Sequence, residues 1–132
     1  MILDSSALVS LVLEETGYEK LVDVMLDAST LHVSTATWVE IGVVSDRRLS
    51  DANRRKLEKV CDALPLTLVP FSVEQARIAR DAHRRYGPRS GSAARLNMGD
   101  CFSYALAKDL DEPLLFVGDD FTYTDVQRVD LG

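Results

Sequence analysis

The stretch Leu114-Leu115-Phe116-Val117-Gly118-Asp119-Asp120 places two acidic residues directly after an uninterrupted apolar run. Four apolar residues ended by glycine are typical of a strand that is buried on both faces. Three similar short runs are found at Met1–Leu3, Leu31–Ser34 and Leu66–Val69. Longer segments with helical periodicity separate these runs. The pattern predicts an α/β fold, a three-layer α/β/α sandwich with a mainly parallel sheet.

Apolar spacing and capping residues mark the expected helices. They cover residues 6–15, 18–26, 35–49, 51–64, a segment from Ser72 toward Gly87, and 98–110. The intervening segment 87–97 has the glycine, serine and proline content of a loop. The tail at 126–131 is expected to add an edge strand. No repeat or linker interrupts the chain, so residues 1–132 are predicted to form one domain.

The composition is that of an ordinary globular protein. Of the 132 residues, 46% are hydrophobic and 27% are charged, which argues against disorder. Cys61 and Cys101 are too few for a disulfide scaffold, and we interpret both as reduced thiols in helix cores. His32 and His83 are interpreted as structural or surface residues. Because no signal peptide or membrane-length apolar run is visible, we expect a cytoplasmic protein with no membrane partner.

The charge is unevenly distributed along the chain. Between Arg47 and Arg95 there are twelve basic and five acidic residues, whereas the remaining residues hold three basic and sixteen acidic ones. A basic region can attract a polyanion even when the net charge, here −6, is negative. Solvated helix faces would explain the same pattern. A polyanionic partner is therefore compatible with the sequence but is not required by it.

Acidic residues from four separate segments are expected to converge at one edge of the sheet. In open parallel sheets, ligands bind beyond the carboxyl ends of the strands. Asp4 follows the first predicted strand, and Asp119 and Asp120 follow the last one. Glu40 lies on the helix after the second strand, and Asp100 lies in the first turn of the helix before the last strand. The sequence thus predicts a cluster of carboxylates.

Each of these acids also has an ordinary structural interpretation. Asp4 could cap the first helix, and Asp100 could interact with the positive end of its own helix. Asp119 and Asp120 could be turn residues. Glu40 has no charged neighbour at helical spacing, although a capping box from Thr37 would explain it. These alternatives remain open at the level of sequence.

A carboxylate cluster is chemically suited to a hard divalent cation. Crowded acids repel one another and raise one another's pKa unless a cation lies between them. Oxygen ligands favour Mg²⁺ or Mn²⁺ over zinc, and such an ion can activate water and neutralise charge on a phosphoryl oxygen. The sequence has no glycine-rich phosphate loop and no serine nucleophile motif. Phosphodiester hydrolysis is therefore the reaction class that this chemistry favours.

Four segments together resemble the PIN-domain family, and more narrowly the VapC-type toxins of bacterial toxin–antitoxin pairs. They are Met1-Ile2-Leu3-Asp4-Ser5-Ser6-Ala7-Leu8, Thr37-Trp38-Val39-Glu40, Leu96-Asn97-Met98-Gly99-Asp100-Cys101-Phe102-Ser103-Tyr104-Ala105-Leu106-Ala107, and Leu114-Leu115-Phe116-Val117-Gly118-Asp119-Asp120-Phe121. The similarity spans nearly the whole chain. It implies a PIN-like domain with metal-dependent endoribonuclease activity.

The resemblance also implies roles for particular residues. Asp4, Glu40 and Asp100 match the family's acidic catalytic site, and either Asp119 or Asp120 matches its fourth member. Asp4 and Asp100 would hold Mg²⁺ or Mn²⁺, while the Ser6 hydroxyl would support Asp4 from behind. A water would attack an RNA phosphodiester in line and leave 5′-phosphate and 3′-hydroxyl ends. Family members commonly cut tRNA or rRNA.

The partners that the resemblance implies are RNA, a VapB-like cognate antitoxin and a second copy of the chain. Phosphate contacts are predicted for four basic residues near the expected site: Arg47, Arg48, Arg89 and Arg95. An apolar groove for the antitoxin is predicted around Leu8, Leu11, Leu21 and Met25, although these residues could equally be ordinary core. Two alternatives remain, a catalytically silent module that binds RNA or protein and a phosphodiesterase directed at DNA.

Overall fold

The structure is a computed structural model that describes all 132 residues. Four parallel strands form its centre. The strands are β1 (Ile2–Leu3), β2 (Leu31–Ser34), β3 (Leu66–Val69) and β4 (Leu114–Leu115). Their order across the sheet is β3-β2-β1-β4, and all three neighbouring pairs are parallel. The predicted sheet is therefore confirmed, and β1, whose carboxyl end leads to Asp4, is one of its two central strands.

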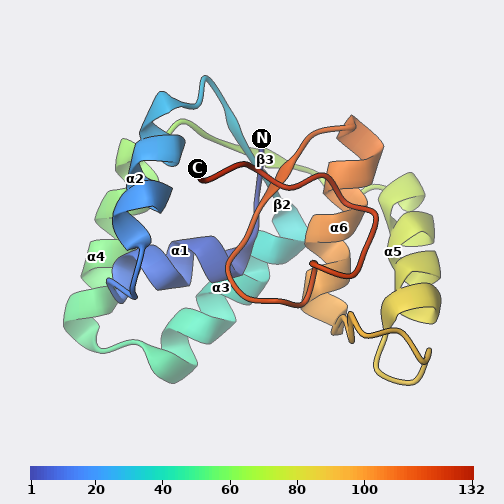
Figure 1. The fold of residues 1–132 in the computed structure, drawn as a ribbon. Helices are drawn as coiled ribbons and strands as arrows, with labels where there is room; N and C mark the ends of the chain where they lie inside the picture. The colour runs from blue at the N-terminus through green and yellow to red at the C-terminus, as the bar shows by residue number, and fades with distance from the viewer.

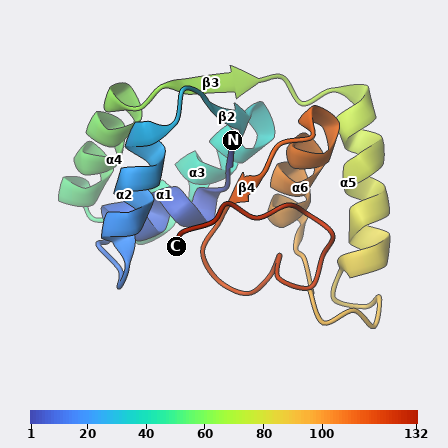
Figure 2. The same ribbon diagram turned by 45° about the horizontal axis from the view of Figure 1, so that its top comes forward.

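Six helices cover the two faces of the sheet (Figures 1 and 2). They are α1 (Ser5–Val12), α2 (Tyr18–Asp27), α3 (Thr35–Arg48), α4 (Asp51–Ala63), α5 (Val73–Tyr86) and α6 (Met98–Leu110). Figure 2 shows α1 to α4 on one side and α5 and α6 on the other. The architecture is the predicted three-layer α/β/α sandwich. None of the helices has the length and apolar character that crossing a membrane requires.

Adjacent residues of the short strands β1 and β4 pack into opposite cores, because successive side chains in a strand point to opposite faces. Ile2 and Leu114 pack with α5 and α6, whereas Leu3 and Leu115 pack with α1, α2 and α4. All four side chains are at most 1% exposed. The continuous apolar runs in the sequence thus reflect burial on both faces.

Three features differ from the sequence-based prediction by more than one residue. The first helix ends at Val12 because the chain turns at Glu14, which adopts a left-handed φ of 51°. The last strand stops at Leu115, so Phe116 and Val117 already belong to the following loop. The predicted strand at 126–131 is wrong, since this tail makes only an isolated bridge between Leu114 and Arg128.

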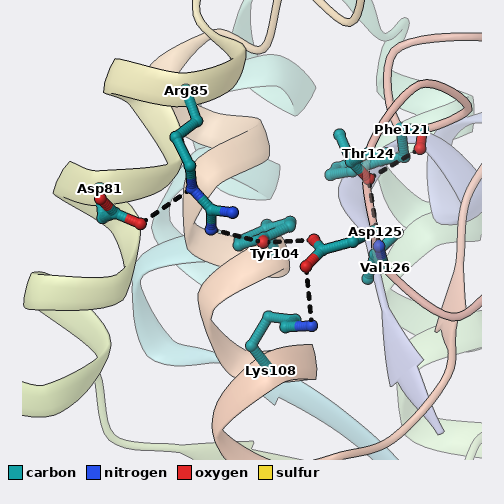
Figure 3. Close-up of polar contacts among 8 residues, drawn as sticks. All are labelled: Asp81, Arg85, Tyr104, Lys108, Phe121, Thr124, Asp125 and Val126. Carbon is teal, nitrogen blue, oxygen red and sulfur yellow. Dashed lines mark hydrogen bonds and ion pairs between the residues drawn. The ribbon is translucent and has the colours of Figure 1, made fainter.

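The loop after β4 is held against α5 and α6 by a polar network (Figure 3). The Tyr104 hydroxyl, on α6, donates to Asp125 Oδ1 at 2.5 Å and accepts from Arg85 Nη2 at 3.1 Å. Lys108 Nζ donates to Asp125 Oδ2 at 3.2 Å. Nearby, Phe121 is 2% exposed and inserts into the core. These contacts fix both ends of the segment that follows Asp119 and Asp120.

Replacing Tyr104 by phenylalanine should destabilise the protein measurably. The change keeps the ring but leaves the buried end of the network without its hydroxyl, a loss that typically costs about 1–3 kcal/mol of unfolding free energy. Urea unfolding followed by circular dichroism measures the effect. Tyr123→Phe is the matched control, because Tyr123 is 60% exposed and makes no hydrogen bond. Equal stability of the two variants would contradict this assignment.

Candidate active site

Asp4 lies where β1 ends and α1 begins, and both oxygens of its carboxylate accept hydrogen bonds. As the N-cap of α1, it accepts a hydrogen bond from the Ser6 backbone N–H at 3.1 Å. The Ser6 hydroxyl donates to the same oxygen at 2.6 Å, and the Ser103 hydroxyl donates to the other oxygen at 2.5 Å. Asp4 is only 2% exposed. The capping interpretation is therefore correct, and the same contacts fix the orientation of the carboxylate.

The hydroxyls around Asp4 connect three elements of the fold. Ser6 Oγ accepts the backbone N–H of Val117 at 3.0 Å, which ties the start of α1 to the residue just beyond β4. Ser103, on α6, lies 3.3 Å from the hydroxyl of Thr37 on α3. Both Ser103 and Thr37 are at most 1% exposed. Ser6 was predicted to support Asp4, whereas Ser103 and Thr37 were not identified from the sequence.

Glu40 projects from α3 toward the first turn of α6. Its Oε1 accepts the Ser5 hydroxyl at 2.8 Å, and its carboxylate lies directly against Gly99. A side-chain carbon at position 99 would overlap that carboxylate, so glycine is required for this contact. The capping-box alternative is excluded because Ser34, rather than Thr37, is the N-cap of α3.

The pKa of Glu40 is raised above its ordinary value. Partial burial is the main cause and the charge of Asp4 adds to it, while the hydrogen bond from Ser5 acts in the opposite direction. A carboxylate in such surroundings holds a proton more readily than one in water.

Asp100 also combines a structural role with a place in the cluster. Its backbone N–H donates to Asn97 Oδ1 at 2.9 Å, and its Oδ2 accepts the Asn97 N–H at 3.0 Å, which makes a capping box. The pKa of Asp100 is raised to about 7, chiefly by burial and also by the charges of Asp4, Asp120 and Glu40, while the hydrogen bond from the Asn97 N–H acts in the opposite direction. The predicted carboxylates therefore come together, and we call Asp4, Glu40, Asp100 and Asp120 the acidic cluster.

The two acids after β4 differ in their relation to Asp100. Both are exposed in the turn that follows Gly118, which has a φ of 99°. The charge of Asp120 contributes to the raised pKa of Asp100, whereas that of Asp119 does not. The buried side chain of Phe121 holds the adjoining backbone. The charge of Asp120 favours it for the fourth acidic position, and the choice between Asp119 and Asp120 stays a prediction.

The predicted phosphate-binding residues all lie on the surface. Arg47 and Arg48 are at the end of α3, and Arg89 and Arg95 are in the loop at 87–97. All four are exposed, and none forms an ion pair. They are free to contact a polyanion, and their role stays a prediction.

The residues predicted to line an antitoxin groove are core residues in this structure. Leu8, Leu11, Leu21 and Met25 are 0%, 7%, 2% and 0% exposed and belong to one buried cluster. Helical periodicity brings them to one face, but that face packs against the sheet and neighbouring helices. The core interpretation, left open by the sequence, is the one that the structure supports.

The donor set of the acidic cluster fits a hard divalent ion. All of its ligating atoms are carboxylate oxygens, and both cysteine thiols have a pKa raised to about 11, chiefly by burial, so neither supplies a thiolate. No three His, Cys, Asp or Glu side chains are grouped closely enough to hold a metal on their own. Mg²⁺ commonly uses only one or two carboxylates and keeps several waters. Asp4 and Asp100 are the two carboxylates for which this role is predicted.

The raised pKa of Asp100 predicts a pH-dependent stability. Between about pH 4 and pH 7 the folded protein holds a proton on Asp100 that the unfolded chain has released. The unfolding free energy should therefore fall as the pH rises through this window in the absence of divalent ions. Asp100→Asn removes the titrating group and should weaken the dependence.

Chemical denaturation of both proteins at pH 5 and pH 8 in EDTA measures this difference. Adding Mn²⁺ at pH 8 should stabilise the wild-type protein more than the variant, because an ion that binds only the folded state raises its stability. Identical pH profiles and identical responses to Mn²⁺ would contradict the placement of Asp100.

The fold and the acidic cluster define a class of protein, an α/β/α domain with carboxylates gathered at the carboxyl edge of a parallel sheet. The chain belongs to the PIN domain family, whose model matches residues 1–127. It is 39% identical over 127 residues to Ribonuclease VapC42 of Mycobacterium tuberculosis, covering 96% of this chain and 97% of that protein.

Two solved structures show the same fold at low sequence identity. The toxin VapC20 of Mycobacterium tuberculosis, described as cleaving the sarcin–ricin loop, has a TM-score of 0.75 at 12% identity and 97% coverage of both chains. A toxin–antitoxin complex from Klebsiella pneumoniae has a TM-score of 0.68 at 15% identity, covering 99% of this chain and 97% of that chain.

Proposed function

We propose that the protein is a Mg²⁺- or Mn²⁺-dependent endoribonuclease that acts as the toxin of a toxin–antitoxin pair. The proposal is supported by the contacts that bring Asp4 and Glu40 to the start of α6, where Asp100 lies, and by the charge of Asp120 near Asp100. Relatives named as VapC ribonucleases, nearly 40% identical over almost the whole chain, support it. RNA phosphodiesters, in tRNA or rRNA, are the proposed substrate.

The residues of the acidic cluster have different proposed roles in the reaction. Asp4 and Asp100 would hold the divalent ion, which supplies charge neutralisation at a phosphoryl oxygen and lowers the pKa of water. Ser6 and Ser103 keep both oxygens of Asp4 oriented before any ligand arrives. Glu40, with its raised pKa, is suited to accept a proton from the attacking water.

The reaction is a hydrolysis in which water attacks phosphorus in line. A new P–O bond forms while the bond to the 3′ oxygen breaks, and the 3′ oxygen takes up a proton. The products carry 5′-phosphate and 3′-hydroxyl ends. Single-stranded or looped RNA suits the site best, because the scissile phosphate must reach the edge of the sheet.

A cognate antitoxin and a second copy of the chain are the proposed protein partners. The solved complex from Klebsiella pneumoniae supports the first of them. Trp38, Val39 and Val43 on α3 are 37%, 66% and 47% exposed, an unusual display of apolar side chains beside Glu40. Exposed apolar side chains of this kind are suited to burial against a protein partner.

Incubating the purified protein with total RNA and with DNA tests the proposal. Each nucleic acid is treated with Mg²⁺, Mn²⁺ or EDTA, and we expect RNA cleavage that requires a metal. Binding without cleavage would favour the silent module, and cleavage of DNA alone would favour a DNA-directed enzyme. Mapping of the new 5′ ends after induction in cells then identifies the RNA.

A further inference from the structure

A recess of about 510 Å³ lies between α5 and α6, on the layer opposite α1 and α2. Ala76 and Ala79 are one helical turn apart on α5, and their small side chains leave the space open. Aromatic and sulfur-containing side chains line the other wall, with the rings of Phe71 and Phe102 5.1 Å apart in an edge-on arrangement. Met98 stands at the mouth with 70% of its surface exposed. Apolar surface of this kind is ready for a ligand.

The rim of the recess is cationic. Arg80, His83 and Arg84 line it, and no carboxylate does. Neither Arg80 nor Arg84 forms an ion pair, whereas Arg77 on the same helix is paired with Glu74 at 3.4 Å. The two free guanidinium groups therefore have no internal partner.

A second recess of about 330 Å³ extends the first. It shares His83 and Arg84 with the first recess and continues to Arg89, again without a carboxylate in its lining. We call the two recesses, which meet at His83 and Arg84, the trough; its apolar side chains lie in the first recess and its basic side chains in both. Positive charge beside an apolar cavity matches the chemistry of a nucleotide, which joins a flat base to a phosphate.

The trough adjoins the acidic cluster through the first turn of α6. Met98 and Cys101 face the recess, Gly99 lies against Glu40, and Asp100 belongs to the cluster. The recess and the cluster thus lie on different sides of one helical turn, and a helix with its side chains is only about 10 Å across. An RNA strand that passes the cluster can reach the recess with a neighbouring nucleotide.

We propose that the recess between α5 and α6 binds an unpaired base of the RNA substrate, while Arg80 and Arg84 contact the adjoining phosphates. This inference rests on the proposed ribonuclease function and locates part of its substrate site. A second copy of the chain is a poorer occupant, because a two-fold contact through this face would bring two cationic rims together. The lack of carboxylates on the rim favours a polyanion.

The test measures binding in EDTA, where cleavage is not required. The probes are a fluorescent single-stranded oligouridylate and an oligomer of the same length and charge in which abasic spacers replace every nucleoside. Ala76→Phe fills the recess. We expect the wild-type protein to bind the oligouridylate about tenfold more tightly than the abasic oligomer. In Ala76→Phe the ratio of the two affinities should fall by a factor of about five or more. Circular dichroism should show that the variant keeps its fold.

The charged rim is tested with Arg80→Ala/Arg84→Ala against the control Arg77→Ala. The double variant should bind both probes about tenfold more weakly, and the dependence of log affinity on log salt should become shallower by about 1.4, the value for two lost single-strand phosphate contacts. Arg77→Ala should change the affinity less than about twofold.

The outcomes separate this proposal from the ribonuclease proposal. Unchanged base preference in Ala76→Phe and unchanged affinity in the double variant, with RNA still cleaved by the wild-type protein, would overturn the subsite alone. If the protein binds the oligouridylate in preference to the abasic oligomer but does not cleave RNA, only the ribonuclease proposal is overturned. If the variants instead change the oligomeric mass, measured by light scattering, and leave RNA affinity intact, the face belongs to a protein contact and the subsite is rejected.

Discussion

Asp100→Asn is expected to reduce RNA cleavage by about a thousandfold or more at saturating Mg²⁺. The substitution removes a negative charge that would hold the proposed divalent ion, yet the amide oxygen can still accept the Asn97 N–H in the capping box of α6. The fold should therefore persist while the activity disappears. Initial rates on a labelled RNA that contains a mapped cleavage site provide the measurement.

The matched control for this loss is Asp23→Asn, which makes the same chemical change on the exposed face of α2. We expect its rate to stay within about twofold of the wild-type rate, because substitutions at exposed sites away from special features have small effects. Asp4→Asn should behave like Asp100→Asn. Cleavage at the wild-type rate by both Asp4→Asn and Asp100→Asn would remove the acidic cluster from the mechanism.

Gly99→Ala is expected to lower the cleavage rate by about a hundredfold, although alanine is the better helix former by roughly 0.5–1 kcal/mol. The added methyl group would overlap the Glu40 carboxylate and force it away from its place beside Asp100. Gly42→Ala is the matched control, since Gly42 lies in α3 and its missing side chain would meet nothing within 4 Å. That variant should keep full activity and gain slightly in stability.

A double-mutant cycle shows whether the effect of Gly99→Ala acts through Glu40. Glu40→Ala removes the carboxylate that the new methyl group would displace. Adding Gly99→Ala to Glu40→Ala should therefore cost little further activity, because contacting residues are not additive. Full additivity, with the fold intact by circular dichroism, would show that the close contact between Gly99 and Glu40 has no catalytic importance.

The order of the elements was predictable because burial on both faces leaves a strong pattern in the sequence. Apolar runs at Met1–Leu3 and Leu114–Leu115, separated by helices, are typical of strands covered on both faces, whereas the edge strand β3 has no fully buried residue. The ends of elements were less predictable. Phe116 is buried and apolar like a strand residue, but the chain leaves the sheet after Leu115. Hydrophobicity reports burial, whereas a strand also requires a hydrogen-bonded neighbour.

The carboxylates of the site were predictable from topology, but their supports were not. Asp4 and Asp100 follow from the rule that parallel strands present ligand-binding residues at their carboxyl ends. Ser5 and Ser103 carry no such signal, because serine is common and its partners lie far away along the chain. The groove prediction at Leu8 and Leu21 illustrates the reverse problem, since a periodic apolar face does not reveal what covers it.

A crystal structure of the protein soaked in Mn²⁺ would show directly whether Asp4 and Asp100 hold a divalent ion. We expect an anomalous difference peak within about 2.3 Å of carboxylate oxygens of both residues, and no such peak in Asp100→Asn. Peaks found only elsewhere on the surface, or a fully occupied ion site without contact to Asp4 and Asp100, would contradict the proposed metal site.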